Sequence, residues 1–172
     1  RGDSILCENP GYRGARNALG RLGNPVIPIP LRNHVLDVEA LPGLEPAGAK
    51  LLFCTPTHQY PMGGILDLSQ RMALVQWAQQ NRCWIIEDDY DSEFHFYNKP
   101  FAAIQGLYEN APVLYMGSFS KTLLPALRVG YLVVPEAVVE PLLWAKQISG
   151  GETPLLTQAT IAEFIESGQF TR

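Results

Sequence analysis

Lys121 is the residue in this sequence whose neighbours most clearly indicate covalent chemistry. It follows the apolar run 113–116 and the hydroxyls of Ser118 and Ser120, and Arg128 comes seven residues after it. A lysine amine that leaves a buried strand can condense with an aldehyde, and an arginine with nearby hydroxyls can bind a phosphate. This combination predicts a site for a cofactor that carries both groups. The first candidate is pyridoxal phosphate, bound to Lys121 as a Schiff base.

A run of three acids, Glu87, Asp88 and Asp89, follows the apolar segment 83–86. A pyridine cofactor needs a carboxylate against its ring nitrogen, and Asp88 is suited to that place, while the Tyr90 phenol can hydrogen-bond the ring oxygen. Three acids after a buried strand repel one another and raise their pKa values, which favours a cationic partner nearby. The alternative, that these acids only form the solvated end of a strand, is equally consistent with this segment taken alone.

The pair Asp88-Asp89 after an apolar strand also resembles the carboxylates of a nucleotide-binding protein. That interpretation requires a phosphate-binding loop of the form GxxxxGK[ST]. Segment 117–122 contains a Lys-Thr pair but lacks the glycine before the lysine. Nucleotide binding is therefore disfavoured.

Four further side chains are candidates for contacts with a ligand. His58 and Tyr60 lie in the loop that follows the strand expected at 50–55, and we expect them to approach the cofactor ring. Arg13 and Arg16 are suited to bind a carboxylate or phosphate of a substrate or effector. Two of these residues have a plainer alternative, His58 as a hydrogen-bonded loop histidine and Arg16 as an exposed helix residue.

The elements that must position these residues alternate between strands and helices. Several strands are apolar on both faces, which is typical of a mainly parallel sheet covered by helices, so we expect a three-layer α/β/α sandwich. Segment 129–134 returns just after Lys121 and is expected to run antiparallel, whereas the prolines of segment 26–31 place that strand at an edge. Polar residues gather where strands end, which is where open α/β sheets bind ligands. The expected strands are 4–8, 26–31, 50–55, 83–86, 113–116 and 129–134, and the expected helices are 13–22, one from Asp67 with Gln70 in a capping box, 135–148, and one from Pro154.

Composition and charge exclude several classes of protein. Hydrophobic residues make up 47% of the 172 residues and charged residues 17%, the balance of a globular domain rather than a disordered segment. The net charge of -4 gives no electrostatic case for nucleic acid binding by this chain, and no apolar stretch approaches the roughly 20 residues that span a bilayer. The three cysteines and three histidines are too scattered for a metal centre, and the cysteines indicate buried thiols in a reducing cytoplasm. Because there is no initiator methionine and the sequence starts almost on a strand, we expect it to be part of a longer protein.

Four motifs extend these interpretations beyond single residues. They are Glu8-Asn9-Pro10-Gly11-Tyr12, segment 55–63, segment 86–94, and segment 117–121 together with 127–131. Together they resemble the large domain of class I/II aminotransferases, the fold-type I enzymes that depend on pyridoxal phosphate. They are still more similar to the aminotransferase-like domain of MocR-type regulators in the GntR superfamily. The resemblance runs over residues 4–172, and it implies part of a large, cofactor-binding domain over 4–150 and a helical segment over 151–172 that leads toward a C-terminal small domain.

The resemblance implies a role for each candidate residue. Lys121 would carry the cofactor, Asp88 would pair with the pyridine nitrogen, and Tyr90 would contact the ring oxygen. Ser118 and Arg128 would bind the phosphate. The family also has a glycine-rich phosphate-binding turn, and usually a ring-stacking aromatic, upstream of this segment, and a substrate-carboxylate arginine in its small domain.

One position departs from the aminotransferase pattern. Aminotransferases usually place an asparagine before the proline of the loop that ends in Pro-x-Gly, where it bonds the ring oxygen. Here that position is Tyr60. The tyrosine matches the regulator branch and disfavours efficient transamination.

The favoured hypothesis is a pyridoxal phosphate-binding domain of a MocR/GntR-type transcriptional regulator, which senses an amine or pyridoxal phosphate through Schiff-base exchange at Lys121. The alternative is a free-standing class I/II aminotransferase that transfers an amino group between an amino acid and a 2-oxo acid. A domain that binds no cofactor and serves only in dimerisation is disfavoured by four intact residues, Lys121, Asp88, Tyr90 and Arg128. The resemblance further implies a homodimer that binds DNA only through a winged helix-turn-helix domain absent from this sequence, and the cysteines and apolar pattern predict a cytoplasmic protein that does not bind membranes.

Overall fold

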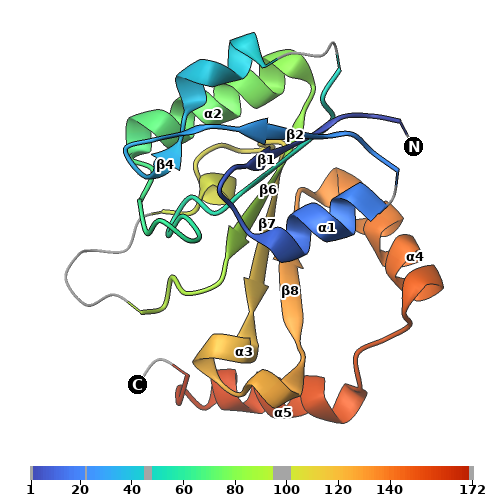
Figure 1. Cartoon of the computed structure of the whole chain (residues 1–172). Helices are drawn as coiled ribbons and strands as arrows, with labels where there is room; N and C mark the ends of the chain where they lie inside the picture. Colours follow the sequence, from blue (N-terminus) through green and yellow to red (C-terminus); the bar gives the residue numbers. More distant parts are fainter. Residues whose placement is uncertain (1, 22, 45–47, 95–101, 171–172) are drawn as a thin grey trace.

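The computed structural model describes residues 2–21, 23–44, 48–94 and 102–170. Within them, one six-stranded sheet forms the centre of the molecule, and helices lie against both of its faces (Figure 1). The strands of this sheet are β1 (Ile5–Glu8), β2 (Val26–Ile29), β5 (Leu51–Cys54), β6 (Trp84–Asp89), β7 (Val113–Ser118) and β8 (Gly130–Val133). The α-helices are α1 (Arg13–Arg21), α2 (Leu68–Asn81), α3 (Phe119–Thr122), α4 (Val139–Ser149) and α5 (Leu155–Glu166).

The strands are hydrogen-bonded in the order β2-β1-β5-β6-β7-β8. β1 pairs in parallel with β2 and with β5, and the pairs β5–β6 and β6–β7 are parallel as well. β8 runs antiparallel to β7. The predicted fold class, an α/β sandwich around a mainly parallel sheet, is confirmed. The antiparallel last strand and the edge position of the proline-containing β2 are confirmed too.

Helix α2 begins where the sequence predicts it. The Asp67 side chain accepts a hydrogen bond from Gln70 N at 2.9 Å, and the Gln70 side chain accepts one from Asp67 N at 3.0 Å, which completes the capping box. Leu74, Val75 and Ala78 form the buried face of α2 and pack into the main hydrophobic core. Because burying each larger apolar side chain contributes about 1.5–3 kcal/mol, this face fixes the helix on the sheet.

Strand β6 runs further than the sequence prediction, which ended it at Ile86. It continues to Asp89 because the acids 87–89 pair with residues 115–117 of β7. Its side chains alternate between the two faces of the sheet, so that Glu87 and Asp89 are buried and Asp88 is half-buried on the other face. The three acids are therefore part of the sheet and do not form a solvated strand end.

The segment after β2 contains a hairpin that the sequence did not indicate. β3 (Leu31–Arg32) and β4 (Val35–Leu36) form a separate two-stranded sheet. The two residues between them, Asn33 and His34, both have positive φ values, of 53° and 68°. Such a pair of left-handed residues is what a tight two-residue hairpin turn requires. The hairpin closes the core next to α2 through the buried residues of β4.

Helix α1 covers the opposite face of the sheet. Its residues Ala15 and Leu19 pack against a smaller cluster formed by Ile5, Cys7 and Phe53. All three cysteines of the chain are buried free thiols. This second cluster therefore lies between α1 and the sheet.

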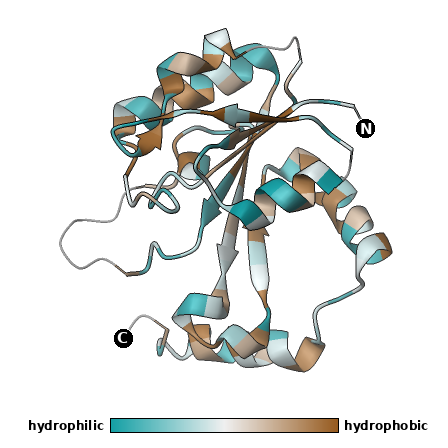
Figure 2. Ribbon diagram, viewed as in Figure 1, coloured by the Kyte–Doolittle hydropathy of each residue, from teal (hydrophilic) through white to brown (hydrophobic). Residues whose placement is uncertain are grey.

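Some apolar side chains lie on the surface of the C-terminal helices. Figure 2 shows hydrophobic residues in the central strands and also on α4 and α5. Trp144 on α4 is 68% exposed, and Leu155 and Leu156 on α5 are each 80% exposed. Among the described residues, none of the helices has the length and apolar character needed to cross a bilayer.

Candidate functional site

The parallel strands place most of the predicted site residues at one edge of the sheet. β1, β5, β6 and β7 all run in the same direction, so the segments that follow them meet at the carboxyl ends of the strands (Figure 1). Ligands bind at this edge in open α/β sheets. In chain order, the strand ends and following segments carry Tyr12, His58, Tyr60, Asp88, Tyr90, Ser118 and Lys121.

Lys121 lies in α3, a short helix held between β7 and β8. Ser118 caps this helix, because its Oγ accepts a hydrogen bond from Ser120 N at 3.1 Å. The ring of Phe119 packs on Tyr131 of β8, with 5.2 Å between ring centroids. These contacts fix the backbone of the first turn of α3, and the exposed side chain of Lys121 extends from this fixed backbone.

Ser118 and Arg128, the predicted phosphate ligands, lie at the same end of the β7–β8 pair. Ser118 is the partner of Gly130 in the antiparallel register, and Arg128 precedes Gly130 by two residues. Arg128 is exposed and has a left-handed backbone with a φ of 54°. That conformation costs a non-glycine residue roughly 1–2 kcal/mol, so the turn before β8 must hold it. Since Ser118 Oγ accepts a bond from the backbone, its hydroxyl hydrogen is left to donate to an anion.

The three acids of β6 have different surroundings. Glu87 accepts hydrogen bonds from the two backbone N–H groups of segment 104–105 at 2.9 and 3.0 Å, and Asp89 accepts one from the Tyr115 hydroxyl at 2.8 Å. Asp88 accepts none from the part of the chain that the structure describes. Burial, together with the neighbouring Asp89, raises the pKa of Asp88 to about 6. A half-buried carboxyl without donors favours a cationic partner, and a protonated pyridine nitrogen is such a partner.

Tyr90 and His58 are joined to each other at this edge. The Tyr90 hydroxyl donates to His58 O at 3.0 Å, and His58 Nδ1 lies 2.8 Å from Asp91 Oδ2. Burial raises the pKa of Tyr90 to about 12, so the phenol keeps its proton at neutral pH and remains a donor. The position of His58 is that of a hydrogen-bonded loop histidine, the plainer of its two interpretations.

Three tyrosine rings form a row at the carboxyl edge, and we call Tyr12, Tyr60 and Tyr90 the tyrosine row. The Tyr60 ring is edge-on to Tyr12, with 5.9 Å between centroids, and edge-on to Tyr90, with 6.3 Å. Tyr12 is 48% exposed and Tyr60 45%, so both offer aromatic surface to a planar ligand. Tyr12 is not among the site residues predicted from the sequence, although an aromatic residue that follows Asn-Pro-Gly at the end of a strand is a signal for such a position.

Arg13 and Arg16 both lie exposed on α1. Arg16 Nη1 donates to Asn9 Oδ1 at 3.2 Å, beside the end of β1. The Arg16 backbone N–H donates to Tyr12 O at 3.2 Å, but within the described residues no side-chain hydrogen bond or ion pair joins either arginine to Asp88 or to the tyrosine row. The structure therefore places Arg16 near the edge of the sheet but does not bring it into the cluster.

A buried arginine supports the loops behind this edge. Arg71 is 1% exposed and donates to the backbone oxygens of Leu66, Pro56 and Ala102 at 2.9, 3.0 and 3.0 Å. Its Nη1 lies 3.7 Å from Glu87 Oε1. These contacts tie the loop after β5 to β6 and to the segment before 104. Arg71 is not among the residues predicted from the sequence, because its partners are distant in the sequence.

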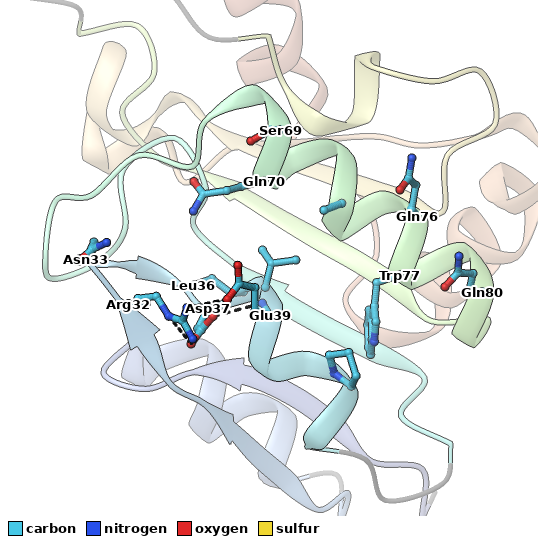
Figure 3. Close-up of a pocket in the computed structure, with 13 residues that line it drawn as sticks. Arg32, Asn33, Leu36, Asp37, Glu39, Ser69, Gln70, Gln76, Trp77 and Gln80 are labelled. Atoms are coloured by element: carbon cyan, nitrogen blue, oxygen red, sulfur yellow. Dashed lines mark hydrogen bonds and ion pairs between the residues drawn. The ribbon is translucent and has the colours of Figure 1, made fainter.

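A pocket of about 570 Å³ lies away from this edge, between α2 and the β3–β4 hairpin (Figure 3). Its lining includes Arg32, which forms ion pairs with Asp37 and Glu39 at 3.0 and 2.6 Å. Trp77 closes another side. None of the residues that the sequence marks for the site lines this pocket. This pocket is therefore separate from the candidate functional site at the carboxyl ends of the strands.

Comparison with known proteins gives a consistent family. A model of aminotransferase class I and II matches residues 1–171. The chain is 38% identical over 169 residues to the probable rhizopine catabolism regulatory protein MocR of Rhizobium meliloti, covering 98% of this chain and 34% of that protein. It is 32% identical over 171 residues to the 2-aminoadipate transaminase of Thermus thermophilus, covering 97% of this chain and 43% of that enzyme. The chain spans about a third of the length of the regulators it matches.

Solved structures agree with this result. The kynurenine aminotransferase of Pyrococcus horikoshii, solved in complex with PMP, superposes with a TM-score of 0.93 at 27% identity, over 99% of this chain and 44% of that one. LysN, the alpha-aminoadipate aminotransferase of Thermus thermophilus, gives a TM-score of 0.88 at 31% identity, over 98% of this chain and 44% of that one. It was solved with N-(5'-phosphopyridoxyl)-L-leucine. The family and these bound molecules imply pyridoxal phosphate as the cofactor.

The residues at the carboxyl edge fit this cofactor. Lys121 supplies an exposed amine, and Asp88 supplies a half-buried carboxyl that accepts no hydrogen bond from the described residues. Ser118 and Arg128 supply phosphate donors at one end of the β7–β8 pair. An amine, a carboxyl and phosphate donors are the groups that a cofactor with an aldehyde, a pyridine nitrogen and a phosphate requires.

Proposed function

Because the chain belongs to the aminotransferase class I and II family, we propose that it is the pyridoxal phosphate-binding domain of a MocR/GntR-type transcriptional regulator. The observation that carries the cofactor-binding role is Asp88, the one acid of 87–89 that accepts no hydrogen bond from the described residues. Its strand ends at the same edge of the sheet as the strand that precedes Lys121. The identity to a regulator, 38%, is higher than the identity to a transaminase, 32%, and this supports the regulatory role.

Each residue of the cluster has a distinct part in binding. Asp88 would hold the proton of the ring nitrogen in place, and Tyr90 would turn its phenol hydrogen from His58 O to the ring oxygen. Arg128 and Ser118 bind the phosphate through charge-assisted hydrogen bonds, and the held backbone of α3 keeps these groups in register with Lys121. Pyridoxal phosphate, when bound, supplies an aldehyde that condenses with primary amines and a ring that withdraws electrons.

Sensing follows from competition for that aldehyde. Lys121 would hold the cofactor through Nζ, and an incoming primary amine would compete with this Nζ for the same aldehyde. Exchange of the amine changes which groups contact this edge, and a ligand that binds two conformations differently shifts their populations. We propose that the protein is a cytoplasmic homodimer and that a separate winged helix-turn-helix domain carries the response to DNA. The exposed apolar side chains of α4 and α5 support packing of this domain against other parts of the assembly.

An aminotransferase that transfers an amino group between an amino acid and a 2-oxo acid is the second candidate function. The similarity to 2-aminoadipate transaminase and to LysN supports it. Tyr60, which stands where aminotransferases usually have an asparagine, favours the regulator. Both functions use the same cofactor at the same edge, so they differ in turnover and not in binding.

Covalent mapping tests the cofactor site. The full-length protein is loaded with pyridoxal phosphate, reduced with borohydride and digested, and the modified peptide is identified by mass spectrometry. We expect modification of Lys121, loss of the label in Lys121→Ala, and retention of the label in Lys146→Ala, which removes an exposed lysine from α4. A label on another lysine of the wild-type protein, or a label that survives Lys121→Ala, contradicts the proposal.

A second assay separates the regulator from the enzyme. The loaded protein is mixed with a panel of amino acids and 2-oxoglutarate, and the visible spectrum and new 2-oxo acids are followed over many equivalents. A regulator is expected to show amine-dependent spectral changes and altered DNA binding with at most one turnover. Sustained formation of 2-oxo acid by the wild-type protein, lost in Lys121→Ala, favours the aminotransferase.

A further inference from the structure

Glu8 lies at the carboxyl end of β1 and is buried. It has no role in the cofactor binding proposed above. Its side chain is 3% exposed. One carboxyl oxygen, Oε2, accepts three hydrogen bonds: from Thr55 N at 3.2 Å, from Thr55 Oγ1 at 2.8 Å and from Gln59 Nε2 at 3.2 Å. The other oxygen, Oε1, is buried and accepts none within the described part of the chain. Such a concentration of donors on one atom makes Glu8 the centre of a local network.

Thr55 and Gln59, which both donate to Glu8 Oε2, also hydrogen-bond to the backbone of Tyr60. Thr55 Oγ1, which donates to Glu8, accepts a hydrogen bond from Tyr60 N at 3.0 Å. Gln59 Nε2 also contacts Tyr60 O at 2.8 Å, so its two hydrogens are shared among neighbouring acceptors. The Thr55 side chain therefore links the N–H of Tyr60 to Glu8 Oε2, and the Gln59 side chain links the C=O of Tyr60 to the same oxygen.

The network also reaches the segment that carries Tyr12. Gln59 Nε2 contacts Pro10 O at 3.0 Å, two residues before Tyr12. The Gln59 backbone closes the loop on itself, because its N–H donates to Gly64 O at 2.7 Å and its C=O accepts from Gly63 N at 2.6 Å. The loop after β5 and the segment after β1 are thus fastened together around Glu8.

We propose that Glu8 is a positioning residue of the cofactor site, which acts through Thr55 and Gln59 to hold Tyr60 in the tyrosine row. The inference rests on the proposed binding of pyridoxal phosphate at this edge. Within the described residues, the Glu8 side chain hydrogen-bonds to Thr55 and Gln59 and not to a ring of the row, so its effect on the cofactor passes through the backbone of Tyr60.

The protonation of Glu8 agrees with this role. Burial raises its pKa to about 7, although the bonds from Thr55 and Gln59 act in the opposite direction. The titratable groups that face it are Cys7 beside it on β1, Cys54 on β5, and Asp88 and Tyr90 from β6 and its end, and none of them supplies a positive charge. A proton on Oε1 leaves Oε2 to accept all three hydrogen bonds. Glutamine, with an amide NH2 in place of that protonated oxygen, should therefore preserve the network.

A double-mutant cycle on the full-length protein tests the proposal. Dissociation constants for pyridoxal phosphate are measured by fluorescence titration for the wild type, Glu8→Ala, Tyr60→Ala and the double variant. We expect Glu8→Ala to weaken binding by about tenfold, Glu8→Gln to stay within about twofold of wild type, and Glu8→Ala to have an effect below about twofold once Tyr60 is alanine. Effects of Glu8→Ala and Tyr60→Ala that multiply independently overturn the proposal.

Glu87→Gln is the matched control for loss of a buried carboxylate. Glu87 is buried like Glu8, but among the described residues its hydrogen-bond donors are the N–H groups of segment 104–105, which lie outside the loop of Tyr60. Its effect on the dissociation constant is expected to be the same with and without the Tyr60→Ala change. If Glu8→Ala does not fold, Thr55→Val replaces it, since this change removes the hydroxyl between Glu8 Oε2 and Tyr60 N and keeps the shape of the side chain.

Amide hydrogen exchange of the apo-protein keeps the positioning role separate from the cofactor role. The amide of Tyr60 is bonded to the Glu8 network, and we expect Glu8→Ala or Thr55→Val to speed its exchange by about tenfold while Glu87→Gln leaves it unchanged. Unchanged exchange at Tyr60 in both network variants overturns the inference. A wild-type protein that binds no pyridoxal phosphate but shows the expected exchange would instead refute the proposed function and leave the role of Glu8 in the loop supported.

Discussion

The Glu8→Gln change is expected to alter how the stability of this protein depends on pH. Burial raises the pKa of Glu8 from 4.5 to about 7 in the folded chain. Between these values the folded chain holds a proton that the unfolded chain releases, so a rise in pH favours the unfolded state. The contribution of Glu8 to the unfolding free energy is therefore fully present below about pH 4.5, falls as pH rises, and is lost above about pH 7.

The magnitude follows from the size of the change. Each pKa unit corresponds to about 1.4 kcal/mol, so the rise from 4.5 to about 7 is worth about 3 kcal/mol of unfolding free energy. Glutamine has no proton to lose, and its amide takes the place of the protonated carboxyl. The unfolding free energy of Glu8→Gln, taken relative to that of wild type, should therefore rise by about 2–3 kcal/mol as the pH goes from about 5 to about 8.

Urea unfolding of the two full-length apo-proteins across this pH range, followed by near-ultraviolet circular dichroism, measures the difference. Glu87 also has a raised pKa because it is buried, but it titrates in both proteins and cancels in the comparison, whereas the charge of Asp88 acts on Glu8 and is part of the measured difference. Glu163→Gln, a change of an exposed glutamate on α5, should follow the wild-type curve. A difference between Glu8→Gln and wild type that stays constant, or that falls as pH rises, would show that Glu8 is ionised in the folded chain and refute the reasoning.

Three other changes have defined outcomes. Asp88→Asn should weaken pyridoxal phosphate binding by about tenfold to hundredfold, because the ring nitrogen loses a charged hydrogen-bond partner, and unchanged affinity in a fluorescence titration would remove Asp88 from the site. Arg71→Met should cost about 3–5 kcal/mol in urea unfolding, because it leaves Glu87 without its buried cation, and adding Glu87→Gln should restore part of that loss. Asp67→Ala should cost about 1 kcal/mol through loss of the α2 cap, and a thermal midpoint equal to that of wild type would contradict it.

Local signals in the sequence predicted the parts of the fold that depend on neighbours. The capping box at Asp67 and Gln70 needs only three residues of spacing, and it is present as expected. Apolar runs predicted the central strands because both faces of a covered parallel sheet are buried. The β3–β4 hairpin was missed because Asn33 and His34 adopt left-handed conformations without a glycine to mark them.

Non-local partners explain what the sequence could not indicate. Glu8 and Thr55 are 47 positions apart, and nothing in the pattern around either residue shows that they meet. The run 87–89 indicated acids near a ligand, but only the structure distinguishes Asp88 from neighbours that are already hydrogen-bonded. Lys121, Ser118 and Arg128 were selected by type and spacing, and their roles stay predictions until the covalent mapping and binding experiments are made.

The strand order has a consequence for synthesis of the chain. β1 can pair with β2 soon after both strands leave the ribosome. The other edge of β1 pairs with β5, where Ile5 is the partner of Leu51. At about 5–20 residues per second, the 46 positions between these partners take about 2–9 s to translate, and during that time one side of β1 has no strand to pair with. The segment with Tyr12 and the loop with Tyr60 can meet only after this delay. A nascent chain paused before β5 should therefore leave the backbone N–H and C=O groups on this edge of β1 unpaired, and one paused once β5 has emerged should not.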